Sequence, residues 1–201
     1  MNKLTGLTIL KKTNFTQIHS LNHKYSLILL FLTFFLTNTS ILAAEKNFPV
    51  GRNKISLYYP ENWQHAFNFL NTPLTLFGPV LNERRAVISI NNTDIQNFSF
   101  DKKELQDNEN SYKKGRLKWL KKNKGKVVRF TGYRVSKWKN VPEVHSIGYS
   151  YTIKNDLFLE KSYFFNCNNE LFNISTLMTW EQNKEHGKTL KKILTSLKCL
   201  K

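Results

Sequence analysis

Residues 157–180 have the sequence LFLEKSYFFNCNNELFNISTLMTW, in which two runs rich in aromatic and β-branched residues flank two asparagines. Asparagine tolerates positive φ angles, so this pair predicts a β-hairpin with a two-residue turn. The turn sets Cys167 opposite Glu170. Because side chains alternate along a strand, one face of the hairpin is then apolar and only Lys161, opposite Thr176, interrupts it. The pairs predicted on this face are Phe165 with Phe172, Tyr163 with Ile174, Leu159 with Met178, and Leu157 with Trp180.

A helix is expected to follow the hairpin and to cover its apolar face. Leucine and isoleucine repeat at helical spacing within Lys184–Lys198. Cys167, on the apolar face, and Cys199, at the end of the helix, are the only two cysteines. We predict that they form a disulfide, which requires the helix to end near Lys198. The alternative is two free thiols, one in the core and one at a frayed helix end.

Residues 1–44 have the composition of a secretory signal peptide. They contain no acidic residue, and a lysine-bearing start precedes the apolar run Leu27–Leu36 and the small residues Ala43 and Ala44. The apolar run is shorter than the roughly 20 residues that span a membrane. We predict that residues 1–44 are cleaved and that residues 45–201 form a single domain, periplasmic or secreted. The alternative is an uncleaved leader that anchors the chain to the inner membrane.

The rest of the chain alternates between strand and helix patterns. We expect a bulge at Gly132, and a three-residue turn, Lys154–Asp156, that brings the preceding tyrosines to the face of Leu159. A long helix is predicted to open at Asp101 and to end at Gly125. The predicted strands are Ile55–Tyr59, Leu74–Phe77, Ala86–Ile90, Val127–Trp138 and His145–Ile153, with Gly78-Pro79 and a polar loop between the second and third.

This order of elements predicts an α+β fold. Runs of hairpin-connected strands with separate helices favour an antiparallel sheet of about six to seven strands. We expect a long central helix and a C-terminal helix to pack on it as an α-β-α sandwich. Trp63 is expected in the core.

Two short segments resemble the PsbP-like superfold. They are Ile55-Ser-Leu-Tyr-Tyr-Pro-Glu-Asn-Trp63 and Ile193-Leu-Thr-Ser-Leu-Lys198. That group includes photosystem II extrinsic proteins, a Ran-binding nuclear import factor and the periplasmic DcrB-like lipoproteins, and the likeness covers Lys54–Lys198 by element order. The resemblance implies the fold alone, because these relatives have unlike functions. The chain departs from the DcrB-like pattern, since no lipoprotein cysteine follows its apolar run.

Positive charge is the strongest functional signal. The chain carries a net charge of +17, and twelve basic residues and no acidic residue lie between Asn110 and Pro142. We predict a surface for an anionic partner formed by Lys114, Lys118, Trp119, Lys121, Lys122 and Arg129. The partner would be an anionic envelope component, with peripheral membrane contact, or an acidic protein. The alternative is a solvated face that keeps the protein soluble. No nucleic-acid motif is present.

Patterns of catalytic residues are absent from the sequence. It contains no His-Glu-x-x-His motif, no Gly-x-Ser-x-Gly elbow and no phosphate-binding glycine loop. The composition bias toward Lys, Asn, Ile and Phe favours a bacterium. We therefore expect a non-enzymatic binding or assembly-accessory domain of the bacterial envelope, with no cofactor, metal or catalytic residue. The alternative is an exported hydrolase or a metal-binding protein centred on Glu143 and His145.

Overall fold

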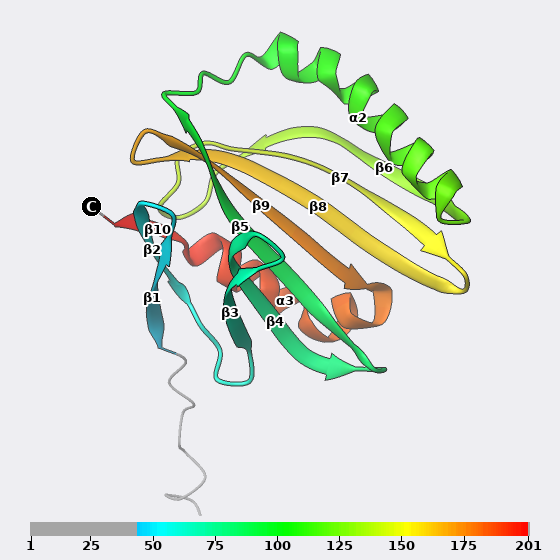
Figure 1. The fold of residues 1–201 in the computed structure, drawn as a ribbon, viewed down its shortest axis with the longest axis horizontal. Coiled ribbons are helices and arrows are strands. Elements are labelled where there is room, and N and C mark those ends of the chain that lie inside the picture. Colours follow the sequence, from blue (N-terminus) through cyan, green and yellow to red (C-terminus); the bar gives the residue numbers. More distant parts are fainter. Residues whose placement is uncertain (1–43, 201) are drawn as a thin grey trace, which may run out of the picture. The chain divides into compact units, whose positions relative to one another are not determined.

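The computed structural model describes residues 44–200 (Figure 1). The predicted signal peptide therefore lies outside the described residues, except for Ala44. Within the described part of the chain, no helix has the length and apolar character needed to cross a membrane. The elements are β1 (Glu45–Val50), β2 (Asn53–Tyr58), β3 (Gln64–Phe69), β4 (Thr72–Leu81), β5 (Arg84–Gln96), α2 (Lys102–Lys122), β6 (Gly125–Ser136), β7 (Val144–Ile153), β8 (Asp156–Cys167), β9 (Glu170–Thr179), α3 (Trp180–Ser196) and β10 (Lys198–Leu200).

The strands form two antiparallel sheets, and the predicted α+β class is confirmed. The large sheet has seven strands in the order β3-β4-β5-β9-β8-β7-β6, and the small sheet has three in the order β1-β2-β10. The sequence predicted one sheet only, because β1 and β10, the two strands that flank β2 in the small sheet, carry no clear strand pattern. Figure 1 shows α2 lying along β6 and β7 on one side of the large sheet, with α3 on the other side.

The hairpin of β8 and β9 has the predicted register. Cys167 pairs with Glu170 across the turn, and the pairing continues in step to Leu159 and Met178. Both turn asparagines have positive φ angles, 50° and 68°. Because the register is in step, the apolar side chains of both strands lie on the face that α3 covers, as the sequence indicated.

The predicted pairing of Leu157 with Trp180 is wrong, because the chain has already left the sheet at Trp180. Thr179 is the N-cap of α3: its hydroxyl accepts a hydrogen bond from the backbone N–H of Gln182 at 3.2 Å, and Gln182 Oε1 accepts one from Thr179 N at 2.8 Å. This reciprocal capping box starts the helix four residues before the predicted Lys184.

The turn between β7 and β8 also differs from the expectation. Ile153 pairs with Asp156, so the turn has two residues, and Lys154 takes the left-handed conformation with φ 55°. A turn shorter by one residue inverts the faces of β7. Tyr149 and Tyr151 therefore lie on the face that α2 covers, opposite to the face of Leu159.

The large sheet consequently has a hydrophobic cluster on each side. On one side, buried residues of the sheet, α3 and the small sheet form the main core, which includes the predicted core residue Trp63. On the other side, Leu120 of α2 packs with Tyr149 and Tyr151. The Arg116 guanidinium of α2 lies 2.8 Å from Glu160 Oε1, so a charged pair fixes the helix over the tyrosines.

The two cysteines join the two sheets. The sulfur atoms of Cys167 and Cys199 lie 2.12 Å apart, at disulfide-bonding distance, as predicted. The required helix end is present, because α3 stops at Ser196 and the chain continues into β10 beside β2. Cys167 ends β8 of the large sheet, so the bond ties the small sheet to the core.

Two further boundaries differ from the expectation. Gly78 and Pro79 lie inside β4 at a register shift, and the β4–β5 turn is Asn82-Glu83, both with positive φ. Helix α2 ends at Lys122, whereas Gly125 begins β6. The bulge predicted at Gly132 is present as a register shift between Thr131 and Arg134.

Candidate functional site

A groove of about 730 Å³ lies between α3 and the strands β6–β9 of the large sheet. Small-molecule sites in proteins usually occupy about 300–1,000 Å³. The groove is on the side of the sheet opposite to α2. Its walls come from β6 and the residues after it, from β7, β8 and β9, and from α3.

Two bulges in β6 direct its arginines into this groove. Val127 pairs with Tyr151 on the α2 face, but the register shifts between Val127 and Arg129, and Arg129 then pairs with Ser150 on the groove face. A second shift around Gly132 also puts Arg134 on the groove face. Strict alternation would have placed the two arginines on opposite faces, and a bulge is the usual device for redirecting a side chain.

Basic side chains from three elements converge on the groove. They are Arg129, Arg134, Lys137, Lys161 and Lys191. Among the described residues, neither Lys161 nor Arg134 forms an ion pair. Burial lowers the pKa of Lys161, and the positive charge of Arg134 lowers it further. The groove is therefore cationic, and the lysine ammonium is held there without a counter-charge.

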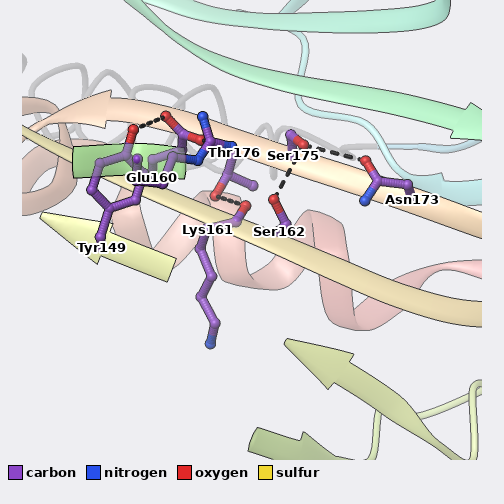
Figure 2. A network of polar contacts seen from close by, with 8 residues as sticks. Tyr149, Glu160, Lys161, Ser162, Asn173, Ser175 and Thr176 are labelled. Atoms are coloured by element: carbon purple, nitrogen blue, oxygen red, sulfur yellow. Dashed lines mark hydrogen bonds and ion pairs between the residues drawn. The ribbon is translucent and has the colours of Figure 1, made fainter. Parts of the chain in front are cut away.

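Among the described residues, Glu160 is the one acidic residue that lines the groove, and its carboxylate lies on the α2 side of the sheet. Glu160 bonds to Arg116, and its Oε2 accepts a hydrogen bond from the Tyr149 hydroxyl at 3.1 Å. Figure 2 shows this cluster beside Lys161, whose side chain extends away from Glu160 and from Ser162. Because neighbouring residues of a strand alternate, the carboxylate lies with α2 and the lysine with the groove.

The wall of the groove opposite the arginines is apolar. Leu159, Met178, Leu190, Leu194 and Trp138 line it; Met178, Leu190 and Leu194 are only 4–5% exposed, whereas Leu159 and Trp138 are partly buried. The Trp138 ring lies 5.4 Å from the Tyr163 ring and 5.6 Å from the Phe165 ring. The groove thus has a basic side built mainly by β6 and an apolar side built by α3, β8 and β9.

The structure divides the predicted anionic-partner residues between two places. Lys114, Lys118, Trp119, Lys121 and Lys122 are all exposed on α2, and we call them the α2 surface. Arg129 lies apart from them in the groove. Sequence reasoning did not select the other basic residues of the groove. One signal for Lys161 was present, because it is the residue that interrupts the apolar face of the hairpin.

Glu143 and His145 are adjacent, but not in the manner of a metal site. His145 Nε2 lies 2.5 Å from Glu143 Oε1, and its Nδ1 contacts the Tyr133 hydroxyl. The Phe100 ring stacks on the imidazole at 3.8 Å between centroids. Both ring nitrogens therefore have partners. Among the described side chains, which do not include that of Glu104, no three His, Cys, Asp or Glu residues are grouped so that they could hold a metal ion.

No family model matches the sequence, and no curated protein matches it. The structure is similar to cyanobacterial PsbP (CyanoP) from Synechocystis sp. PCC 6803, with a TM-score of 0.54, 6% identity, and coverage of 81% of this chain and 96% of that chain. It is also similar to LpqN, a protein involved in cell envelope biogenesis of Mycobacterium tuberculosis, with a TM-score of 0.50, 13% identity, and coverage of 79% and 91%. The chain therefore has the PsbP-like fold that its sequence predicted.

Proposed function

We propose that this chain is an exported, non-enzymatic binding or assembly-accessory domain of a bacterial envelope, and that its cationic groove binds an anionic partner. The observation that carries the proposal is the convergence of Arg134 and Lys161 in a concave site without a carboxylate partner in the described chain. The cysteine pair at bonding distance supports an oxidising compartment. The similarity to LpqN is a similarity of fold, and it is compatible with an envelope role for this chain.

Charge and shape together favour the groove over an open surface. A concave site walled by protein focuses the field of its basic groups and raises the local concentration of anions. The exposed lysines of α2 are screened by salt within about 10 Å at 0.1 M, as are the exposed Arg129 and Arg134, whereas the partly buried Lys161 is screened less. An anion bound beside Lys161 would also supply the counter-charge that the folded chain does not provide.

The α2 surface is a second place where an anionic envelope component could bind. Its lysines are exposed on one helix, and Leu117 beside them is 50% exposed. A basic helix with exposed apolar side chains is suited to peripheral contact with anionic lipid head groups. If this surface has no partner, its charge serves solubility.

A vesicle-binding experiment distinguishes the groove from the α2 surface as the site that binds the anionic partner. The purified protein is mixed with phosphatidylglycerol vesicles, with phosphatidylcholine vesicles as the neutral reference, at low and at raised salt. We expect binding to the anionic vesicles that weakens with salt and is reduced by Arg134→Gln combined with Lys161→Met. The matched control combines Lys118→Gln with Lys121→Met on α2. A loss confined to this control would move the function to α2, and no loss with either variant would contradict both sites.

A further inference from the structure

The apolar wall of the groove is an uncovered continuation of the protein core. On one face of β8, Phe165 and Cys167 are 0% and 1% exposed beneath the rest of the core. Farther along the same face, Leu159 and Tyr163 are only partly buried, although they belong to the same apolar row. The small sheet and α3 therefore cover one end of this row and leave the other end open to the groove.

The opposite wall has a different chemistry. Arg129 and Arg134 reach it from β6, and Lys161 rises between the two walls from β8. Thr176, opposite Lys161, donates its hydroxyl to the Lys161 carbonyl at 3.2 Å, so this hydroxyl is already engaged. The groove thus offers concentrated positive charge on one side and apolar surface on the other.

We propose that the groove binds a single amphiphile that has an acidic head group and an alkyl chain. The head group lies against Arg134 and Lys161, and the chain lies along the partly buried side chains of Leu159, Tyr163 and Trp138. This inference rests on the proposed function, since it names the class of anion that the groove takes.

Other occupants match only part of this surface. An inorganic anion would leave the apolar wall in contact with water. A neutral amphiphile would leave the two basic groups without a counter-charge. An extended acidic peptide would place backbone N–H and C=O groups against an apolar wall, and unpaired backbone groups away from water are costly.

The first experiment compares three probes by isothermal titration calorimetry with the purified protein. The probes are dodecyl phosphate and dodecyl maltoside, each below its critical micelle concentration, and inorganic phosphate. We expect dodecyl phosphate to bind at one molecule per chain, about a hundredfold or more tighter than inorganic phosphate, which corresponds to burying roughly four methylene groups. It should also bind about tenfold or more tighter than the neutral detergent, through its charge-assisted contacts.

Two variants then separate the contributions of charge and of the apolar wall. Lys161→Met keeps the aliphatic stem and removes the charge, so it should weaken dodecyl phosphate about tenfold and leave dodecyl maltoside unchanged. Gly187, on the side of α3 that lines the groove, is the site for filling it. A Cβ added there would lie 2.8 Å from Asn183 Oδ1, so the end of the flexible Asn183 side chain must turn aside, and nothing else lies within 4 Å. Gly187→Leu should fold, because leucine is a better helix former than glycine.

The filled variant gives the sharpest outcome. Gly187→Leu should abolish the advantage of dodecyl phosphate over inorganic phosphate, whereas Gly187→Ala, the matched control, should retain most of it. Equal binding of dodecyl phosphate and inorganic phosphate to the wild type would overturn the amphiphile and leave a simple anion site. Equal binding of the two dodecyl compounds would overturn the role of charge. If no anionic probe binds, the proposed function fails as well.

Discussion

Lys161 on β8 and Arg134 on β6 line the same groove, and neither forms an ion pair with any residue that the structure describes. Burial and the neighbouring arginine both disfavour the charged form of the lysine and lower its pKa from the ordinary 10.5. The Lys161 ammonium lies 4.9 Å from the centroid of the Tyr163 ring, a cation–π contact that offsets part of the cost of keeping the charge there.

The first prediction is that Lys161→Met stabilises the ligand-free protein. Removing the desolvated charge should raise Tm, but by less than the about 2–4 °C that 1 kcal/mol gives in a protein of this size, because Lys161 is only half-buried and the variant also loses the contact with the Tyr163 ring. Because the folded pKa is lowered, the wild type binds fewer protons when folded than when unfolded between that pKa and 10.5, so its stability rises with pH there. The variant should lack this rise. Thermal melts at neutral and alkaline pH test both points, and Lys118→Met on exposed α2 is the control.

The second prediction concerns His145. Burial lowers its pKa below 6.5, while the hydrogen bond and charge of Glu143 oppose the shift. As pH falls below 6.5, the unfolded chain takes up a proton that the folded chain resists, so stability should fall by up to about 1.4 kcal/mol per pH unit. Denaturant unfolding at pH 7.5 and 5.5 measures the loss. His145→Gln should reduce this dependence on pH, and an unchanged dependence would assign it to other groups.

The third prediction concerns the bond between the two sheets. Cys167 and Cys199 are 32 residues apart, so on the chain-entropy model their disulfide contributes ~3–4 kcal/mol to the free energy of unfolding. Cys199→Ser should lower the unfolding free energy by this amount, with a second effect on the pairing of β10 with β2. Reductant should have little effect on this variant. If reductant does not destabilise the wild type, the cysteines are not bonded in solution.

The fourth prediction concerns the attachment of α2. Arg116 bonds to Glu160 and lies 5.2 Å and 5.3 Å from the centroids of the Tyr112 and Tyr149 rings. Arg116→Met should cost about 2 kcal/mol, less than for a fully buried pair because the arginine is one-third exposed. The matched control is Lys113→Met, which removes a helical i,i+4 pair and should cost about 0.3–0.5 kcal/mol.

The fluorescence of Trp119 provides a local readout for this prediction when the other three tryptophans, Trp63, Trp138 and Trp180, are replaced by phenylalanine. Its ring lies 5.8 Å from that of Tyr151 beneath the helix, so partial release of α2 should shift the tryptophan emission to longer wavelength. A loss of stability in Arg116→Met without this shift would contradict a role of Arg116 in holding the helix.

Local chemistry explains which parts of the fold were predictable. The asparagine pair fixed the register of β8 and β9. Two adjacent residues that tolerate positive φ favour a two-residue turn, and the length of the turn sets which residues pair. The faces of β7 were not predictable by the same reasoning. Lys154 took the left-handed position there, and a lysine gives no signal of that conformation. One residue in a turn therefore reversed the assignment of Tyr149 and Tyr151.

The candidate site was only partly predictable, for a related reason. Gly132 indicated the position of a bulge in β6. The sequence does not show how the residues after a bulge pair with the next strand, and that pairing placed Arg134 in the groove. The concentration of basic charge was visible as a run along the chain. Its division between α2 and the groove depends on which strand face each residue occupies, and two register shifts in β6 decided that.

The small sheet has a consequence for the order in which the protein assembles. Strand β2 lies between β1 and β10, so it pairs with a neighbour in sequence on one edge and with Lys198–Leu200 on the other. Synthesis proceeds from the N-terminus at roughly 5–20 residues per second, so that second edge stays vacant for about 7–28 seconds after β2 emerges. During this interval β2 is open to pairing with another chain. A newly made molecule can therefore pair β2 with another chain until β10 is in place. Low local concentration of other chains, or a chaperone bound to β2, would prevent this.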